Sequence, residues 1–439
     1  MRILILVATA LGALAFVAHA NPDGLVPSLE PPGQWGSAVQ GSATDVFVYI
    51  DYNYEVDRAS ITREAVGTAP GPTGPIPVNK DLLFHQYRHT ITPRIEVGLL
   101  KDMWLYSALP IVISQSRELK LDEGVTTMSS STLADGYIPG AGFDANNPST
   151  PPPAGIVFRG ADRHGIDQVH VGLGVAPMNQ ARDDTKPTWK IGGELRIPIG
   201  RVQRFDPTDP GGNSAVGNGT YQARLWTTFD RRLGWAEPWI EMFWQVPVGY
   251  TDSAPFKNPG FGATNTGMQQ TAGVVGGFEA YAVDDKDHNK ISLELGGHAI
   301  AHFEGRDYSE MWEVFAYAGH SSTDPLSLDA DPTTPGVQPL SHPGISNFEN
   351  YLETAARIAV RGELGKNVKF AVIGETIWKT DHVLSFADAG VDRSGNDLVD
   401  PGTDEVNPLH NDRIDLVGHR YHSTDNFGVV LAVQGMVLF

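Results

Sequence analysis

The chain ends with the stretch Phe427-Gly-Val-Val-Leu-Ala-Val-Gln-Gly-Met-Val-Leu-Phe439, a long apolar strand pattern whose last residue is aromatic. A soluble domain seldom leaves such a strand at a free sheet edge, because an exposed edge pairs with other chains and aggregates. A closed β-barrel removes the edge by pairing its last strand with its first. The stretch therefore predicts an all-β transmembrane antiparallel barrel of the bacterial outer-membrane type, and we expect the barrel assembly machinery to recognise this strand through Phe439.

The beginning of the sequence predicts export. Arg2 precedes an apolar run over residues 3–17, and Ala18-His19-Ala20 follows as a small-x-small cleavage pattern. The run is shorter than the roughly 20 residues that span a bilayer. We therefore predict a cleaved signal peptide over residues 1–20, a periplasmic tail or partial lumen plug over 21–44, and one barrel domain over 45–439 in the cell outer membrane.

The composition of the chain indicates which classes of partner it can bind. The formal net charge is -20, whereas a nucleic-acid-binding protein would carry a basic patch, so nucleic acid is not an expected partner. Cysteine is absent, so no disulfide can support the fold. Beyond residue 20, no stretch approaches the ~18 consecutive apolar residues of a membrane helix, so contact with outer-membrane lipid must be made by strands.

Strand-like runs alternate with connections that are in turn short and long, which is the pattern of short periplasmic turns and long extracellular loops. Counting the runs gives about twelve strands. They are expected over 45–57, 83–100, 103–117, 165–178, 187–200, 218–229, 237–250, 268–283, 290–304, 350–364, 368–380 and 426–439. Fourteen strands are the alternative, with a further hairpin at 311–318 or 414–422.

Alternation within the strands identifies the face that lines the lumen. In the strand from Pro187, apolar residues such as Ile191 and Leu195 occupy one face and charged residues the other. A charge that faces lipid costs several kcal/mol, so the charged face must point into the barrel. The pore-lining candidates chosen in this way are Arg88, Arg94, Glu96, Lys190, Glu194, Arg196, Arg224, Glu294, His298, Arg357, Arg361 and Glu375. Aromatic residues at 104, 229, 235, 239 and 439 are expected to form a girdle at the periplasmic interface.

Two groups of residues carry side chains of the kinds that bind metal ions. His298 and His302 share a strand face but lie about 13 Å apart, too far for one ion to bind both. The acidic loop over 392–405 places oxygen side chains at Asp392, Asn396 and Asp400 in a spacing similar to that of an EF-hand. These three residues are a candidate site for weakly bound calcium, and no other cofactor is expected.

The sequence offers no nucleophile whose spacing places it beside a base. His320-Ser321 and His422-Ser423 are neighbours in loops, and adjacency alone does not make a nucleophile and its base. No nucleotide-binding, zinc or cysteine–histidine motif occurs. The chain is therefore predicted not to be an enzyme.

Three segments carry a family resemblance. The stretch from Ile91 to Ile111, together with Gly165-Ile-Asp-Gln-Val-His-Val-Gly-Leu-Gly174 and Gly192-Gly-Glu-Leu-Arg-Ile-Pro-Ile-Gly200, resembles the outer-membrane channels of the meta-pathway phenol-degradation family. The chain differs from the family pattern in a tighter Gly165-Ile-Asp167 and in Ile199, which replaces a threonine. The resemblance implies a barrel that admits small, often apolar or aromatic, compounds, and it implies no catalytic residues.

The predicted function is that of a porin-like passive channel for small solutes, apolar or aromatic ones among them, through a lumen of mixed charge. Twelve strands lie between the eight that side chains fill and the sixteen of an open porin, so a narrow conduit and a closed, salt-bridged interior are both open at this point. The alternative function is a non-conducting surface barrel whose long acidic loops bind a partner or calcium.

Overall fold

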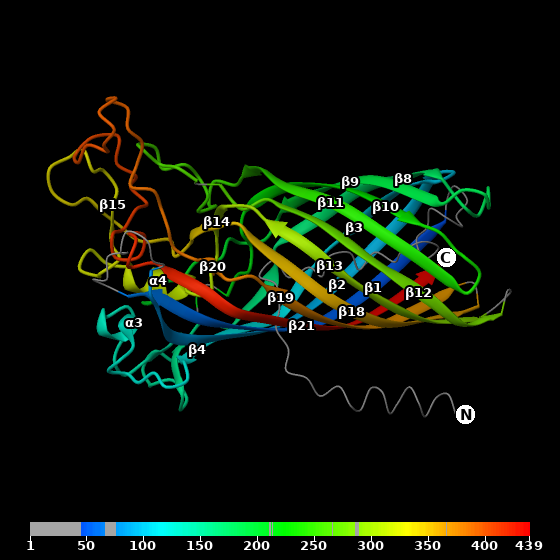
Figure 1. The fold of residues 1–439 in the computed structure, drawn as a ribbon, viewed down its shortest axis with the longest axis horizontal. Helices are drawn as coiled ribbons and strands as arrows, with labels where there is room; N and C mark the ends of the chain where they lie inside the picture. The colour runs from blue at the N-terminus through cyan, green and yellow to red at the C-terminus, as the bar shows by residue number, and fades with distance from the viewer. Residues whose placement is uncertain are drawn as a thin grey trace.

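The computed structural model describes residues 45–65, 76–209, 212, 214–265, 267–285, 289–365 and 367–439. The predicted signal peptide and tail lie outside these residues. The described chain forms a closed antiparallel barrel of 12 strands, with the long loops gathered at one end (Figure 1). No helix among the described residues is long and apolar enough to span a membrane.

Each strand of the barrel pairs with the next along the chain. Two positions in the barrel wall are each shared by two shorter strands, β3 with β4 and β7 with β8. In order around the wall the strands are Val46–Glu64 (β1), Val78–Leu100 (β2), Met103–Ala108 (β3) with Ile111–Leu121 (β4), Arg163–Ile166 (β7) with Gln168–Met178 (β8), Thr188–Pro198 (β9), Thr220–Asp230 (β10), Ala236–Tyr250 (β11), Thr271–Asp285 (β12), Asn289–His302 (β13), Tyr351–Leu364 (β18), Val368–Lys379 (β19) and Tyr421–Leu438 (β21).

The last strand closes the barrel as predicted. β21 pairs with β1 from Phe47↔Leu438 to Arg63↔Tyr421, so neither strand is left as a free edge. The apolar stretch at the end of the sequence is therefore half of the closing seam.

Shorter elements occupy the loop end of the barrel. They are Ser131–Ala134 (α3), Phe143–Asp144 (β5), Ile156–Arg159 (β6), Gly305–Asp307 (β14), Trp312–Ala318 (α4), Leu328–Asp329 (β15), Pro339–Leu340 (β16), Ser346–Phe348 (β17) and His382–Val383 (β20). The segment 311–318, a candidate for an extra hairpin, forms the helix α4 instead. Residues 414–420 are turns that lead into β21, so the fourteen-strand alternative is wrong.

Some strands extend further than their alternation predicted. β1 continues past Asp57 to Glu64, and β2 begins at Val78 rather than Leu83, so that Glu64 pairs with Val78. In this extension Ala59, Ile61 and their neighbours are buried on both faces of the strand. The polar–apolar alternation is lost there because loops cover the outer part of the barrel.

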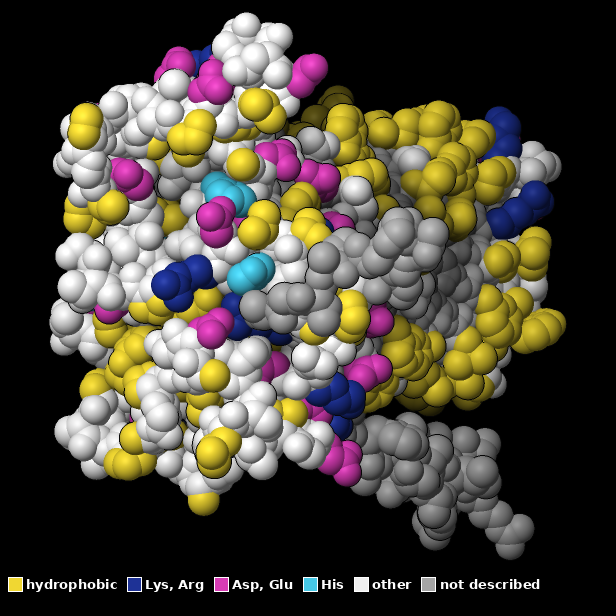
Figure 2. Space-filling model, turned by 60° about the vertical axis from the view of Figure 1, so that its left-hand side comes forward, with side chains coloured by type: hydrophobic (Ala, Val, Ile, Leu, Met, Phe, Trp, Pro, Cys, Tyr) yellow, Lys and Arg dark blue, Asp and Glu magenta, His cyan; other side chains and the backbone are white. Residues whose placement is uncertain are grey.

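The barrel wall carries an apolar outer face. Its exposed side chains alternate with buried ones along each strand and include Ile50, Ile95, Leu105, Leu173, Leu195, Leu225, Leu293, Leu295, Ile358, Val372, Leu431 and Val433. In Figure 2, hydrophobic side chains cover the barrel wall, whereas acidic and histidine side chains gather over the loops. Such a surface is stable when it contacts lipid, as in an outer-membrane barrel.

The expected aromatic girdle is only partly present. Trp235 and Phe439 are 67% and 77% exposed, as girdle residues should be. Trp104 and Trp239 are instead buried, on the face of the wall that points inward. Trp104 occupies the face opposite Leu105, and the period of two along β3 turns it into the lumen.

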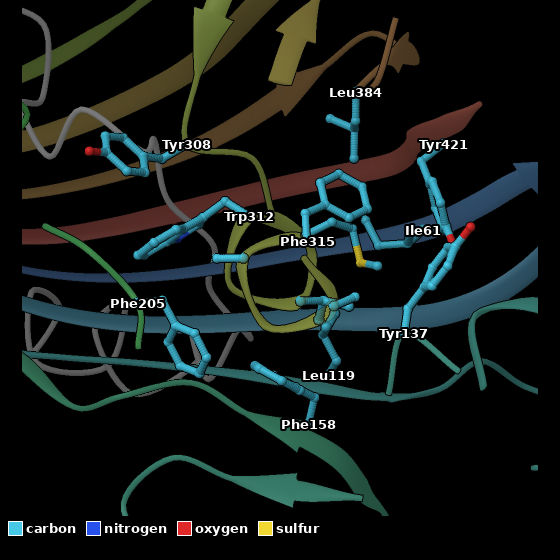
Figure 3. Packing of buried hydrophobic residues seen from close by; sticks show 14 of the residues in the cluster. Ile61, Leu119, Tyr137, Phe158, Phe205, Tyr308, Trp312, Phe315, Leu384 and Tyr421 are labelled. Carbon is cyan, nitrogen blue, oxygen red and sulfur yellow. The ribbon is translucent and has the colours of Figure 1, made fainter. Parts of the chain in front are cut away.

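The most extensive hydrophobic cluster of the described residues lies at the loop end of the barrel. It surrounds α4, whose Trp312 and Phe315 are fully buried. The rings of Phe315 and Tyr421 are 5.4 Å apart, and those of Trp312 and Tyr308 are 5.0 Å apart (Figure 3). We call residues 305–348, the connection from β13 to β18 that contains α4, the cap. The cap fills the loop end of the barrel, which is predicted to be extracellular, with an apolar core.

Candidate functional site in the barrel lumen

The pore-lining candidates all lie on the inward face of their strands. The side chains of Arg94 and Arg224 are 13% exposed, and the other ten residues are buried. This burial fits the inward orientation that the alternation predicted. Their part in conduction stays a prediction.

The charges on one side of the lumen are paired. Arg94 contacts Glu96 at 2.6 Å, and Nε of Arg196 donates to Glu194 at 2.8 Å. Across two strands, Arg224 donates to Glu241 at 2.8 Å. Each guanidinium therefore has a carboxylate within hydrogen-bond distance, which offsets part of the cost of burying either charge.

A second set of ion pairs lies between β13 and β18. Glu294 of β13 contacts Arg357 at 3.1 Å and accepts a hydrogen bond of 2.8 Å from Nε of Arg361. All three side chains are almost completely buried. Since one carboxylate serves two arginines, this region is densely filled rather than open.

His298 lies between two carboxylates. Its Nε2 is 3.1 Å from Glu353 and its Nδ1 is 2.8 Å from Glu375. Glu353 also reaches His302, at 3.6 Å. The two histidines thus meet at a shared carboxylate from the neighbouring strand, which their spacing on β13 alone could not reveal. Glu353 could have been identified from the sequence, because it lies on the same strand face as the pore-lining candidate Arg357.

Aromatic side chains line the lumen towards the periplasmic turns. Trp104, Tyr106, Trp226, Trp239 and Phe243 pack together there, and we call this group the aromatic shelf. The indole Nε1 of Trp226 donates to the hydroxyl of Tyr106 at 3.1 Å. The hydrogen bond and the packing hold the rings in one fixed arrangement.

Three glycines let the rings of the shelf lie flat against the wall. A Cβ at Gly172 would overlap the ring of Tyr106, and a Cβ at Gly174 would overlap that of Trp104. A Cβ at Gly192 would overlap Trp226. These glycines belong to the segments that carry the family resemblance, so their spacing has a physical reason in this chain. Predictions from charge alone missed the shelf.

A polar cavity of about 60 Å³ lies between the aromatic shelf and the cap. We call it the chamber, and its wall is formed by Arg88, His170, Arg196, Asn218, Gln222 and Gln245. Tyr308 of the cap also lines it. The chamber contains two of the predicted pore-lining arginines, but its amide side chains, which also include Gln168 and Gln203, were not predicted.

The cap is fixed to the barrel wall by a buried ion pair. Nη2 of Arg163, in β7, contacts Oε1 of Glu313, in α4, at 2.7 Å. The same guanidinium lies over the ring of Trp312, 4.7 Å from its centre, and donates through Nη1 to the carbonyl of Ala215 at 2.9 Å. We call the Arg163–Glu313 pair the latch. A second contact joins Arg117 of β4 to the carbonyl of Ser309 at 3.1 Å.

Two titratable groups in the extracellular loops are buried. Burial, with Arg306 nearby, lowers the pKa of His342 to about 3, and Nδ1 of this histidine accepts the N–H of Gly344 at 2.9 Å. Burial raises the pKa of Asp415 to about 7, although its carboxylate accepts the N–H groups of Ala387 and Asn411. At neutral pH the imidazole of His342 is therefore uncharged.

The calcium candidates lie in an exposed loop whose oxygens contact the loop itself. Asp392 accepts the N–H groups of Gly395 and Asp397 at 2.7 and 2.9 Å. Asn396 donates to Asp400 at 3.1 Å. Within the described ranges, no group of three or more histidine, aspartate or glutamate side chains is arranged to hold a metal ion. Calcium binding at this loop stays a prediction.

No protein-family model and no curated protein matches this sequence. Among solved structures, it is similar to an outer membrane channel from Pseudomonas putida F1, with 8% identity and a TM-score of 0.43 over 94% of this chain and 100% of that one. A FadL homologue of Pseudomonas aeruginosa matches with 9% identity and a TM-score of 0.32, over 91% and 93% of the two chains. The outer membrane protease OmpT from Escherichia coli matches with 8% identity and a TM-score of 0.27, over 90% and 97%. These likenesses concern the fold alone.

Proposed function

We propose that this protein is an outer-membrane channel for small solutes whose extracellular end is opened by movement of the cap. The observation that carries the proposal is the polar chamber in the lumen, which Tyr308 of the cap borders and which arginine and amide side chains of the wall line. A concave space with a few convergent polar groups is what a small-molecule site requires. A solute path does need polar groups along its length.

The cap is suited to act as a gate. α4 is only seven residues long, and it packs against the inner wall through side chains of its own. Its polar attachments to the wall include the latch, the contact of Arg117 with Ser309, and a hydrogen bond of 3.2 Å from the hydroxyl of Ser423 in β21 to Glu310. These are side-chain contacts outside the strand ladder, so they can separate while the strands stay paired.

The composition of the lumen suggests the class of solute. Rings of the aromatic shelf offer an apolar surface, and the chamber above them offers amide and guanidinium donors. A solute with an apolar or aromatic body and one polar group would find a partner in each layer. This expectation agrees with the compounds implied by the family resemblance of the sequence.

The alternative is a non-conducting barrel whose loops bind a partner. The specific observation in its favour is the closed extracellular end, together with the dense ion pairs around Glu294 and His298. Calcium at the loop of Asp392 belongs to this alternative.

Single-channel recording in planar bilayers tests the proposal. The full-length chain, refolded and checked by heat-modifiable gel mobility, should give brief, discrete current steps. Silence from folded protein, even after the latch is weakened, would favour the non-conducting barrel.

Ion selectivity adds a second test of the conduit. Arg94 is paired with Glu96, so Arg94→Glu replaces a neutral pair by two carboxylates inside the lumen. The reversal potential in a salt gradient should then move towards cation selectivity. Lys257→Glu, at an exposed loop position, is the control and should leave the reversal potential unchanged. An unchanged value for Arg94→Glu would place Arg94 outside the ion path.

A further inference from the structure

We propose that the chamber is a binding site for a small organic carboxylate of about two to four carbon atoms. The inference deepens the channel proposal, because it names the class of solute, and it rests on that proposal only for the transport step. The site itself is argued from the size of the chamber and from the hydrogen-bonding groups that face it.

The volume sets the size of the ligand. The chamber measures about 60 Å³. A cavity needs about 10–15 Å³ by this kind of measure to hold one water molecule, so the chamber has room for roughly four to six heavy atoms. Propionate, with five heavy atoms, is a suitable probe, whereas a two-ring compound would require the cap or the shelf to move.

Two amide donors in the chamber have only a poor acceptor. Nε2 of Gln222 is 3.3 Å from the sulfur of Met268, and Nδ2 of Asn218 is 3.9 Å from the same sulfur. Neither amide group has another acceptor among the residues that the structure describes. A thioether is a weak acceptor, and Gln222 is only 5% exposed, so its donor is also shielded from bulk water.

The orientation of both amides is fixed by their oxygens. Oε1 of Gln222 accepts a hydrogen bond of 2.9 Å from Gln245. Oδ1 of Asn218 accepts the N–H of Thr220 at 2.8 Å and a longer bond from Gln168. Turning the amide of Asn218 over would place its nitrogen against the N–H of Thr220, so this nitrogen must face Met268, and the nitrogen of Gln222 faces the same sulfur while Gln245 donates to its oxygen. The wall therefore presents fixed donors that an incoming oxygen atom could use.

The charged groups of the chamber also favour an acceptor. Arg196 donates through Nε to Glu194, and its guanidinium faces the chamber together with that of Arg88. A guanidinium pairs with a carboxylate through two parallel hydrogen bonds. Asp167 and Asp307 also line the chamber, but they accept the backbone N–H groups of Asn218 and Tyr308, at 3.0 and 2.7 Å. Each of these carboxylates thus holds a backbone N–H, whereas the amide N–H groups of Asn218 and Gln222 have only the sulfur of Met268 among the described residues and are the donors that a ligand could use.

Isothermal titration calorimetry of the refolded full-length protein in detergent tests the site. Propionate should bind at least tenfold more tightly than propionamide, which has the same shape and no charge. Equal affinities for the two compounds would overturn the carboxylate assignment. Absence of heat from propionate with folded protein would overturn the site altogether.

Variants identify the donors. Gln222→Met keeps the length of the side chain but removes its donor, and it should weaken propionate binding by about tenfold, the effect of losing one hydrogen bond to a charged group. Gln269→Met is the matched control, because Gln269 is also buried but donates to the carbonyl of Phe303, outside the chamber. Its affinity should be that of the unchanged protein. Unchanged binding by Gln222→Met would contradict the assignment of the donor.

A second variant serves if Gln222→Met does not fold. Met268→Leu removes the competing sulfur acceptor and keeps the apolar volume, so propionate should bind as well as before or better. Weaker binding would overturn the inference. Because titration needs no current, binding by a silent barrel would refute the channel and keep the site, whereas a conducting barrel without binding would refute the site alone.

Discussion

The latch offers a quantitative test of the cap as a gate. Arg163 has no exposed side-chain surface and Glu313 has 5%, so both charges are removed from water when the cap is closed. Glu313→Gln keeps the shape of the side chain but leaves the guanidinium without its counter-charge. Removing one partner of a buried ion pair typically costs about 3–5 kcal/mol.

The surroundings of Arg163 place the expected cost at the lower limit. The guanidinium keeps its hydrogen bonds to the carbonyls of Ala215 and Arg204 and its position over Trp312. We therefore expect the closed cap to lose about 3 kcal/mol relative to an open state in which Arg163 is hydrated. Since about 1.4 kcal/mol is a factor of ten, the ratio of open to closed channels should rise by about a hundredfold.

Open probability at fixed voltage in planar bilayers measures this ratio. The control is Asp404→Asn, which breaks the exposed Arg393–Asp404 pair, and surface pairs contribute only about 0–1 kcal/mol. A double variant, Arg163→Met with Glu313→Leu, removes both charges and should restore the closed state, because apolar replacement of a buried pair is commonly neutral. An unchanged open probability in folded Glu313→Gln would refute the gating role of the latch.

Three further predictions concern the shelf, the cap and the seam. Gly192→Ala should lower the free energy of unfolding in urea by about 1–3 kcal/mol, because its Cβ would overlap the indole ring of Trp226. Gly193→Ala is the control and should change this free energy little, because the atom nearest to its Cβ would be 3.5 Å away. Equal effects of the two variants would contradict the described packing of Trp226 against Gly192. His342 binds a proton only after the cap opens, since its folded pKa of about 3 is below the ordinary value near 6.5, so the cap is fully stabilised above pH 6.5 and loses this stability as the pH falls towards 3. The raised pKa of Asp415 acts in the opposite sense, because it destabilises the cap as pH rises from about 4 to 7, and this effect is common to both proteins. Acidification should therefore favour the open state more in the unchanged protein than in His342→Asn, and identical slopes of open probability against pH would exclude His342. Phe439→Ser should lower the amount of heat-modifiable folded protein in the outer membrane, and normal amounts would remove Phe439 from recognition by the assembly machinery.

The barrel was predictable because its two faces meet different solvents. Lipid outside and charged groups inside impose a period of two, which Lys190, Glu194 and Arg196 display against Ile191 and Leu195. The pattern predicted about twelve strands, with fourteen as the alternative, and it predicted the closing seam. It also fixed which charged residues point inward, since each charge excluded its face from lipid.

The cap could not be predicted, because its environment is apolar on all sides. Residues 311–318 form a short apolar run, and a buried strand and a buried helix give the same pattern at that length. Glu313 was the one charge in the run, and its partner Arg163 lies far away in the sequence. Only a three-dimensional structure brings the two together.

The chamber and the shelf were missed for a different reason. Charges mark a lumen clearly, but glutamine and tryptophan are common on either side of a barrel wall. Trp104 and Trp239 fit a girdle by their position near the periplasmic turns, and only the strand register turns them inward. Glycines opposite aromatic rings, such as Gly174 beside Trp104, were the usable signal.

The arrangement of the lumen argues that solutes are selected by groups that act at contact rather than by a long-range electric field. Arg94, Arg224 and Glu294 each have an opposite charge at about 3 Å, and the field of such a pair fades over a distance shorter than the Debye length of about 8 Å at physiological salt. A solute that enters the lumen therefore meets little long-range attraction. The amide nitrogens of Asn218 and Gln222 act only at contact, where an oxygen atom of the solute can replace the sulfur of Met268. Solutes should accordingly be discriminated at the chamber by the individual hydrogen bonds that they form there. The cap determines only when the chamber can be reached.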